Sequence, residues 1–273
     1  MWRLLVLCLV LPLIVILGLA GVYITVPCIT WRQFDSSIQA NLANLPCNYG
    51  AGEVIYIGLE TGPSACRRFH PKITVCFDRH QHRTYWTSHF LENVRSDCSK
   101  SSHRWNSSFF DGVNPEMWYK NNKFDRGHLS PRCDFEGDLE RKMTFYYINA
   151  APQNLSLNRG GWKDLEVYAR SNATKKVAKV ITGTYGTLDT FGGISVPKNF
   201  FKILVFCDSS FEIYVGVNYG TRRSANDVCL PVACSWRHAQ TREDIMTTQI
   251  YCCGYNATLI RSFGLTGKEL KIH

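Results

Sequence analysis

The chain has 273 residues, enough for one large domain or two small ones with a buried core. Hydrophobic residues make up 45% of it and charged residues 19%, a composition that argues against intrinsic disorder. The formal net charge of +9 favours a polyanionic partner, either nucleic acid or an anionic membrane surface, without deciding between them.

The N-terminus carries an apolar run at residues 4–26. A secretory signal has an apolar core of about 7–15 residues and a membrane span needs about 20, so this run is long enough for either role. Small residues at Gly18 and Ala20 resemble a cleavage site and favour a cleaved signal peptide over residues 1–27. The alternative is a retained type II signal anchor that leaves residues 28–273 outside the cytosol.

Cysteine usage also predicts export, because twelve cysteines without a CxxC pair are typical of a disulfide-bonded extracellular protein. Loss of Cys8 with a signal peptide would leave an odd number, which predicts one free or intermolecular thiol. The adjacent Cys252 and Cys253 are not expected to bond to each other. Asn-x-Ser/Thr triplets also fit a glycosylating compartment; they begin at Asn106, Asn154, Asn172 and Asn256.

Segments rich in β-branched and aromatic residues predict strands, at residues 53–59, 73–77, 83–90, 176–182, 201–207 and 211–217. The clearest helix is predicted over residues 158–170, where apolar side chains recur at roughly helical spacing. No repeat or Pro/Gly/Ser-rich linker divides residues 28–273. The pattern predicts one α+β domain with a largely antiparallel central sheet flanked by helices.

The first segment with chemical character is FDRGHLSP, residues 124–131. His128 has the side chain best suited to proton transfer near neutral pH. If the segment is extended, Arg126 lies on the same side, and its planar fork matches phosphate oxygens. The pair therefore suits attack on a phosphodiester. Taken alone, however, an Arg-Gly-His segment is better explained as a structural loop histidine beside a surface arginine.

A second segment, LNRGGWKDLE at residues 157–166, contains Asn158 and Glu166 eight residues apart. On one helix this spacing places them near the same face, two turns apart. An amide oxygen and a carboxylate can together bind a hard cation such as Mg²⁺ or its waters. The alternatives are that Asn158 caps the helix N-terminus and that Glu166 is a solvated helix residue.

In combination, three pieces resemble the DNA/RNA non-specific endonuclease family: DRGH at residues 125–128, TFYYINAAPQ at residues 144–153 and LNRGGWKDLE. This is the ββα-metal, or His-Me finger, group that includes secreted bacterial nucleases and mitochondrial endonuclease G. The pieces follow the expected order, so together they are far more specific than any one alone. The resemblance implies a ββα-metal catalytic motif within the fold.

The resemblance implies a role for each matched residue. His128 matches the general base that activates the attacking water. Asn158 matches the sole direct protein ligand of the divalent cation, and Glu166 matches the carboxylate that holds the cation's water. Arg126 matches the motif arginine near the phosphate, and Asn149 matches the asparagine whose segment helps to orient the histidine.

Two positions match in a different way. Arg104, within the segment SHRW, is a looser match to a further family arginine that lies upstream. Phe145 stands where some bacterial members carry another active-site asparagine. Because the endonuclease G branch also has Thr-Phe-Tyr there, we interpret this phenylalanine as a difference between branches rather than a sign of inactivity.

The implied activity is metal-dependent, sequence-non-specific hydrolysis of DNA and RNA to 5′-phosphate and 3′-hydroxyl ends. Mg²⁺ is the expected cofactor, with Mn²⁺ as a substitute. Because water is the nucleophile, the 2′-hydroxyl of RNA is not needed. We expect a secreted enzyme that contacts a membrane only if the N-terminal run is retained as an anchor, and a homodimer is also considered.

Two alternatives predict no cleavage. One is a catalytically silent nucleic-acid-binding module with the same fold, against which the retained His128, Asn158 and Glu166 argue. The other is a disulfide-rich, membrane-anchored interaction domain in which the motif is incidental. The sequence leaves the biological role, the preference for DNA or RNA and the disulfide connectivity open.

Overall fold

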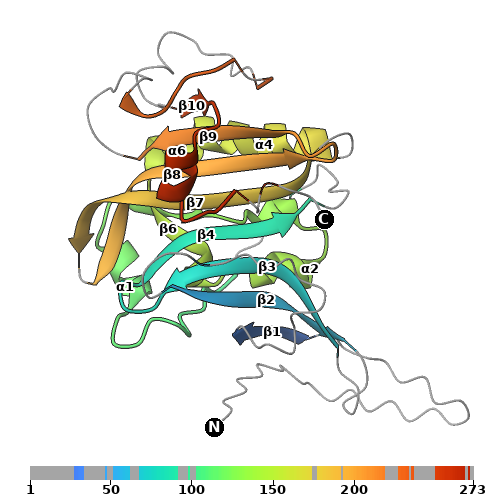
Figure 1. The fold of residues 1–273 in the computed structure, drawn as a ribbon. Helices are drawn as coiled ribbons and strands as arrows, with labels where there is room; N and C mark the ends of the chain where they lie inside the picture. Colours follow the sequence, from blue (N-terminus) through green and yellow to red (C-terminus); the bar gives the residue numbers. More distant parts are fainter. Residues whose placement is uncertain are drawn as a thin grey trace, which may run out of the picture.

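A computed structural model describes residues 28–33, 47, 52–61, 68–91, 98, 103–173, 177–191, 193–218, 227–233, 235–236, 250–267 and 270 (Figure 1). The predicted signal peptide or anchor, residues 1–27, lies outside these residues. None of the helices in the described part of the chain has the length and apolar character needed to cross a membrane.

The described residues form one eight-stranded sheet in which every neighbouring pair of strands is antiparallel (Figure 1). Its spatial order is β1 (Cys28–Gln33), β2 (Glu53–Thr61), β3 (Arg68–Asp78), β4 (Arg83–Phe90), β7 (Val177–Phe191), β8 (Ile194–Phe206), β9 (Phe211–Val217) and β10 (Ile250–Cys253). The order departs from that of the chain only between β4 and β7. The predicted α+β class and antiparallel sheet are confirmed.

The segment between β4 and β7 leaves the sheet and contains all the proposed site residues. It holds α1 (Pro115–Lys120), β5 (Phe124–His128), the 3₁₀ turn η2 (Arg132–Asp134), α2 (Asp138–Met143), the 3₁₀ turn η3 (Tyr147–Asn149), β6 (Ala150–Asn154), α3 (Leu155–Arg159) and α4 (Gly161–Ala173). β5 and β6 pair as a separate antiparallel hairpin. A last helix, α6 (Ala257–Ser262), follows β10.

The predicted helix over residues 158–170 is in fact two helices, and this prediction was wrong. α3 ends at Arg159, and α4 begins at Gly161. Gly160 between them has φ −102° and ψ −122°, a non-helical conformation that glycine adopts readily. Asn158 and Glu166 therefore lie on different helices, not two turns apart on one.

The alternative role of Asn158 as a helix N-cap is also wrong. The N-cap of α3 is Asn154, whose side chain accepts a hydrogen bond from the Ser156 backbone N–H. Asn158 lies within the last turn of α3. Its amide is therefore free of the capping role and can serve the site.

Strand β8 is an inner strand of the sheet and is buried on both faces, because α4 covers one face and α6 covers the other (Figure 1). Phe200 and Leu204 pack with α4, whereas Phe201 packs in another cluster with α6. The cluster under α4 also contains Leu129, which directly follows β5. The hairpin is thus anchored to the same core as the helix that follows it.

Disulfides among the described residues are Cys47–Cys76, Cys98–Cys133 and Cys229–Cys253. Cys252 is also disulfide-bonded. The prediction that Cys252 and Cys253 do not pair with each other is therefore confirmed. Within the described part of the chain, Cys207 is a free and exposed thiol.

Candidate active site

The hairpin formed by β5 and β6 requires the glycine between the arginine and the histidine of its motif. In the antiparallel register, Gly127 lies opposite Ala151. A Cβ atom at Gly127 would lie 2.6 Å from Cβ of Gln153, which is far closer than such atoms approach. The absence of a side chain at this position therefore allows the two strands to pack.

Arg126 and His128 share one face of β5, as the sequence predicted for an extended segment. Both pack against Trp105. The Trp105 and His128 ring centroids are 4.8 Å apart, and Cζ of Arg126 lies 5.9 Å from the Trp105 ring centroid. This single indole thus holds the two motif side chains next to each other.

The imidazole of His128 is held by aromatic packing rather than by hydrogen bonds. Phe145 meets it edge to face, with 5.1 Å between the ring centroids, and Trp105 packs on it as described. Nε2 is buried and has no hydrogen-bond partner among the described residues. Burial, with a smaller contribution from the charge of Arg132, lowers the pKa of His128 to about 4. The ring is therefore neutral at physiological pH, the form that a general base requires.

Arg126 lies in a cage of three aromatic rings. Its Cζ atom is 5.4 Å from the ring centroid of Tyr119 and 5.8 Å from that of Tyr147, in addition to the contact with Trp105. Such cation–π contacts stabilise a guanidinium without using its N–H donors. Nε of Arg126 is buried and has no partner among the described residues. The cage therefore fixes the group and leaves donors for an anion.

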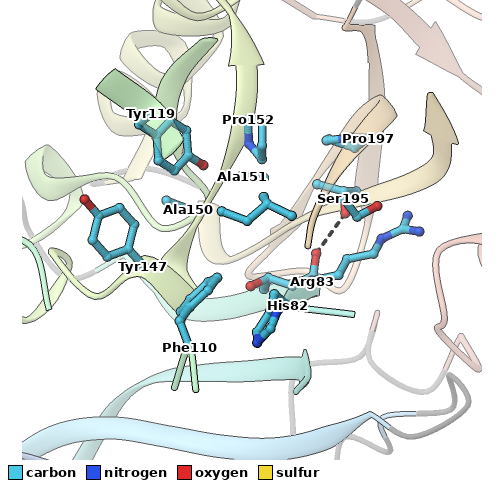
Figure 2. A pocket seen from close by; sticks show the side chains of 13 residues that line it. His82, Arg83, Phe110, Tyr119, Tyr147, Ala150, Ala151, Pro152, Ser195 and Pro197 are labelled. Atoms are coloured by element: carbon cyan, nitrogen blue, oxygen red, sulfur yellow. Dashed lines mark hydrogen bonds between the residues drawn. The ribbon is translucent and has the colours of Figure 1, made fainter. Parts of the chain in front are cut away.

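Tyr119 and Tyr147 also border a small cleft, which Trp105 does not line. Figure 2 shows the two tyrosines on one side of this cleft and His82 and Ser195, from the β3–β4 turn and β8, on the other. The cleft does not include Arg126 itself. It is a boundary of the cage rather than a second reaction site.

Arg104 makes no hydrogen bond, ion pair or ring contact with the other candidate site residues in the described part of the chain. Its neighbours His103 and Trp105 both contact Phe145, with ring centroids 5.0 and 5.1 Å apart. Arg104 lies between them and is exposed. Its side chain is therefore accessible to solvent, unlike that of Arg126, which three aromatic rings surround.

Asn149 fixes the chain immediately after His128. It is fully buried, its Oδ1 accepts a hydrogen bond from Ser130 N at 2.9 Å, and its Nδ2 donates to Ser130 O at 2.9 Å. Nδ2 also donates to Thr144 O, and the Asn149 backbone oxygen accepts from Leu129 N. The amide of Asn149 is therefore fully engaged in holding the loop that follows His128.

Asn158 is held by an acidic residue of the motif. Its Nδ2 donates to Oδ2 of Asp125 at 3.0 Å, and Arg159 forms an ion pair with Asp125 at 2.7 Å. Burial alone would raise the pKa of Asp125, but the hydrogen bonds from Arg159 and Asn158 outweigh it, so that the pKa is lowered. Because the amide nitrogen is committed to Asp125, Oδ1 is the atom of Asn158 that is left for a cation.

Glu166 lies on α4 beside other charged groups. Burial is the main cause that raises its pKa, and the charge of Asp134 adds to it, while Lys202 and Arg170 act in the opposite direction. Lys202 is 1% exposed; its Nζ donates to Thr182 Oγ1 at 2.6 Å. Burial lowers the pKa of this lysine. The positive charge of Lys202 thus favours the ionised form of Glu166.

The donor chemistry fits a water-rich divalent cation. No group of three or more His, Cys, Asp or Glu side chains in the described part of the chain is arranged to hold a metal ion. Oδ1 of Asn158 and the Glu166 carboxylate are hard oxygen donors, and Mg²⁺ keeps most of its water when it binds to proteins. A site with one direct protein ligand would therefore favour Mg²⁺ or Mn²⁺ over zinc.

Comparison with known proteins identifies the family of the chain. The sequence profile of the DNA/RNA non-specific endonucleases matches residues 50–257, well over half of the chain. The chain belongs to this family. The resemblance carried by the three motif segments is therefore confirmed.

Three relatives of the endonuclease family illustrate how far the similarity extends. A salivary endonuclease of Lutzomyia longipalpis is 30% identical over 51% of this chain and 39% of its own length. A nuclease of Nostoc sp. is 34% identical over 40% of this chain and 41% of its own length. Mitochondrial endonuclease G of Bos taurus is 29% identical over 59% and 60%. The chain therefore spans about two fifths to three fifths of these relatives.

A solved structure supports the family fold. The crystal structure of an EndoG/EndoGI complex aligns with a TM-score of 0.51 and 20% identity, over 72% of this chain and 83% of the other. At this identity the likeness concerns the fold. It agrees with the α+β arrangement and the antiparallel sheet described above.

Three residues of this candidate site carry no role in the sequence-based prediction. Asp125 belongs to the motif itself, so its position was a signal for the contact with Asn158. Trp105 adjoins Arg104, but nothing in the sequence indicates that it packs on His128. Lys202 could have been found as a lysine within the apolar run FFKILVF at residues 200–206, because a buried ammonium group requires a partner.

Proposed function

We propose that the chain is a metal-dependent endonuclease that hydrolyses phosphodiester bonds in DNA and RNA without sequence specificity. One observation carries the proposal beyond family membership: Arg126 and His128 lie side by side on Trp105, with His128 in its neutral form. An anion-binding fork and a base at one place suit attack of water on a phosphodiester.

In the proposed reaction His128 accepts a proton from water as the oxygen attacks phosphorus. Arg126 donates hydrogen bonds to the phosphate oxygens on the same side. A divalent cation held by Oδ1 of Asn158 would supply charge stabilisation at the phosphate and the leaving oxygen. Glu166 would hold water beside that cation. The bond between phosphorus and the 3′ oxygen breaks, and that oxygen keeps the electron pair and takes up a proton from solvent, which gives 5′-phosphate and 3′-hydroxyl ends.

The hairpin β5–β6 followed by α3 and α4 is proposed as the ββα-metal unit. Asp125 supports this assignment, because it lies on the strand of His128 and bonds to Asn158 on α3. Asn149 would act through the loop after His128, which it clamps. Arg104, whose side chain is exposed, is proposed to attract the polyanion rather than to take part in the chemistry.

Export is proposed together with this activity. Three disulfides within the described residues favour an oxidising compartment. A secreted protein with residues 1–27 removed is the main proposal, and a type II membrane anchor is the alternative. Immunoblotting of cells and medium for a chain shortened at its N-terminus tests this choice.

The activity is tested by incubating the protein with supercoiled plasmid and with RNA, each with Mg²⁺, with Mn²⁺ or with a chelator. We expect both substrates to be degraded with either cation and to survive with the chelator. Binding without cleavage would instead support a silent nucleic-acid-binding module. Neither binding nor cleavage would support an interaction domain in which the motif has no chemical role.

A further inference from the structure

A buried chain of hydrogen bonds starts directly behind the proposed base. Ser130 follows His128 by two residues, and its Oγ lies 3.0 Å from Nδ1 of His89 on β4. Nε2 of His89 lies 2.9 Å from Oδ2 of Asp134, and Oδ1 of Asp134 accepts a hydrogen bond from Arg170 at 2.9 Å. These four side chains connect the loop after β5 with helix α4.

The charge of Asp134 sets the direction of the bonds that this carboxylate makes to His89 and Arg170. Burial alone would raise the pKa of this carboxyl, but the hydrogen bond and charge of His89, with Arg170 and Lys202, lower it. As a carboxylate, Asp134 accepts from Nε2–H of His89. On the other side of the ring, Nδ1 of His89 shares a hydrogen bond with the Ser130 hydroxyl, whose oxygen in turn lies 2.9 Å from Oγ1 of Thr87.

The set Ser130, His89 and Asp134 has the side chains of a serine hydrolase, but it is closed to substrate. The three residues are 0%, 2% and 3% exposed. Ser130 Oγ is also engaged by Thr87. Since no ester or amide can reach this hydroxyl, a nucleophilic role is excluded and a structural link remains.

The two ends of the link are the two parts of the proposed active site. At one end, Asn149 clamps both the N–H and the carbonyl of Ser130, and so fixes the loop that bears His128. At the other end, Arg170 follows Glu166 by one helical turn on α4. A catalytic arrangement must be held to within roughly 0.5 Å, so the relative position of loop and helix matters for the rate.

We propose that Ser130 and His89 are positioning residues that hold the loop of the base against the helix that carries Glu166. The proposal rests on the endonuclease function argued above. It requires that loss of the Ser130–His89 bond slow the chemical step without weakening substrate binding. The residues that would touch the phosphate, Arg126 above all, are held separately by aromatic rings.

Two variants of the full chain cut the same bond from opposite sides. Ser130→Ala removes the hydroxyl, whereas His89→Gln keeps an N–H near the ε position for Asp134 and loses the δ nitrogen. With a short fluorogenic DNA duplex and saturating Mg²⁺, we expect each variant to lower kcat about 10- to 100-fold with KM nearly unchanged. The double variant should be no slower than the slower single one, because the bond can be lost only once.

Thr184→Val is the matched control. Thr184 is 1% exposed and donates one buried hydrogen bond, to Thr84 O at 2.8 Å, but it lies outside the link. Its loss should lower the unfolding temperature about as much as Ser130→Ala does and leave kcat near the wild-type value. If Ser130→Ala does not fold, His89→Gln alone decides the comparison with this control.

The outcomes separate the inference from the function on which it rests. An active wild type whose two single variants keep full kcat would overturn the positioning role and leave the endonuclease proposal intact. Multiplied losses in the double variant would likewise overturn a shared link. A wild type without chelator-sensitive cleavage would overturn the endonuclease proposal, and the positioning role with it.

Discussion

On one face of β5, Arg126 and His128 lie against aromatic rings, whereas on the other side Asp125 is joined to Asn158 and Arg159 by hydrogen bonds. The first pair keeps buried nitrogen atoms without partners, and the second arrangement commits its polar atoms to one another. Packing therefore fixes a group while leaving its hydrogen-bonding capacity unused. Hydrogen bonding fixes a group by using that capacity.

The buried nitrogen atoms without partners on the aromatic face reduce the stability of the free protein. A buried donor or acceptor without a partner typically costs about 1–3 kcal/mol. Nε of Arg126 and Nε2 of His128 carry this kind of cost in the free protein. A bound phosphate would accept a hydrogen bond from Nε of Arg126. The cost of leaving this donor without a partner would then be removed on binding, which increases the affinity for the substrate.

The largest effect is expected from removal of the base on the aromatic face. His128→Ala should lower kcat by about 10²- to 10⁴-fold, because a positioned base contributes that much. Affinity for DNA should change little, since Arg126 remains. The measurements are initial rates and equilibrium binding by fluorescence anisotropy. His80→Ala, in the exposed turn after β3, is the control histidine; a His128→Ala protein with near-normal rate would remove this residue from the mechanism.

The hydrogen-bonded side is tested by Asn158→Ala. Loss of Oδ1 should reduce the rate by about 10²-fold and raise the Mg²⁺ concentration needed for half activity, because a cation ligand is lost. Asp125→Asn, which weakens the hold on the Asn158 amide, should have a smaller effect in the same direction. An unchanged Mg²⁺ titration for Asn158→Ala would show that the cation is bound elsewhere.

Both sides of β5 depend on Gly127, so Gly127→Ala should disturb them together. The added methyl group would collide with Gln153, and overpacking of this kind costs about 1–3 kcal/mol of folding free energy. Thermal unfolding followed by circular dichroism measures the loss. Gly137→Ala is a suitable control, since its nearest neighbour would be at an ordinary 3.7 Å. Equal stability of the two variants would contradict the clash.

The packing of Trp105 on His128 also predicts how the pKa of this histidine responds to substitution of the tryptophan. Burial lowers the pKa of His128 to about 4, so its neutral form persists as the pH falls below the ordinary histidine value of about 6.5. In Trp105→Ala, water reaches the ring, and the pKa should rise towards 6.5. The base would then be lost at a higher pH. NMR titration of the ring proton measures this, and Trp105→Phe should give a smaller rise; no rise in Trp105→Ala would mean that other groups exclude water from the ring.

The smallest effect on kcat is expected from substitution of Arg104. Arg104 is exposed and lies outside the Trp105 cage, so Arg104→Ala should change kcat by no more than about two- to threefold. Arg126→Ala, measured alongside it, should be far more damaging. A large kcat loss in Arg104→Ala would instead support the catalytic role that the motif match implied.

The sequence predicted well those features that depend on local pattern. Residues 83–90 and 211–217 are strands with the predicted bounds, because β-branched and aromatic residues fill them. Arg126 and His128 share a face because alternation in a strand requires it. The hairpin strand β6 was not predicted, since Ala150–Asn154 lacks such residues and is extended through its pairing with β5.

The features that were missed depend on contacts between distant segments. The helix break at Gly160 placed Asn158 on α3, so its alignment with Glu166 on a single helix was wrong. Trp105 and His89 have no local signature of their roles. Each acquires its role from a partner on another element, namely His128 and Ser130.

The pairing of β4 with β7 has a consequence for folding. Phe90 lies opposite Lys179, so the two strands meet only after the whole intervening excursion of the chain has been closed into a loop. Closing such a long loop is entropically unfavourable, and topologies rich in distant contacts fold slowly. Since the excursion carries the proposed active site, the proposed cleavage activity and the joining of the two halves of the sheet should return together during refolding, in a single late step.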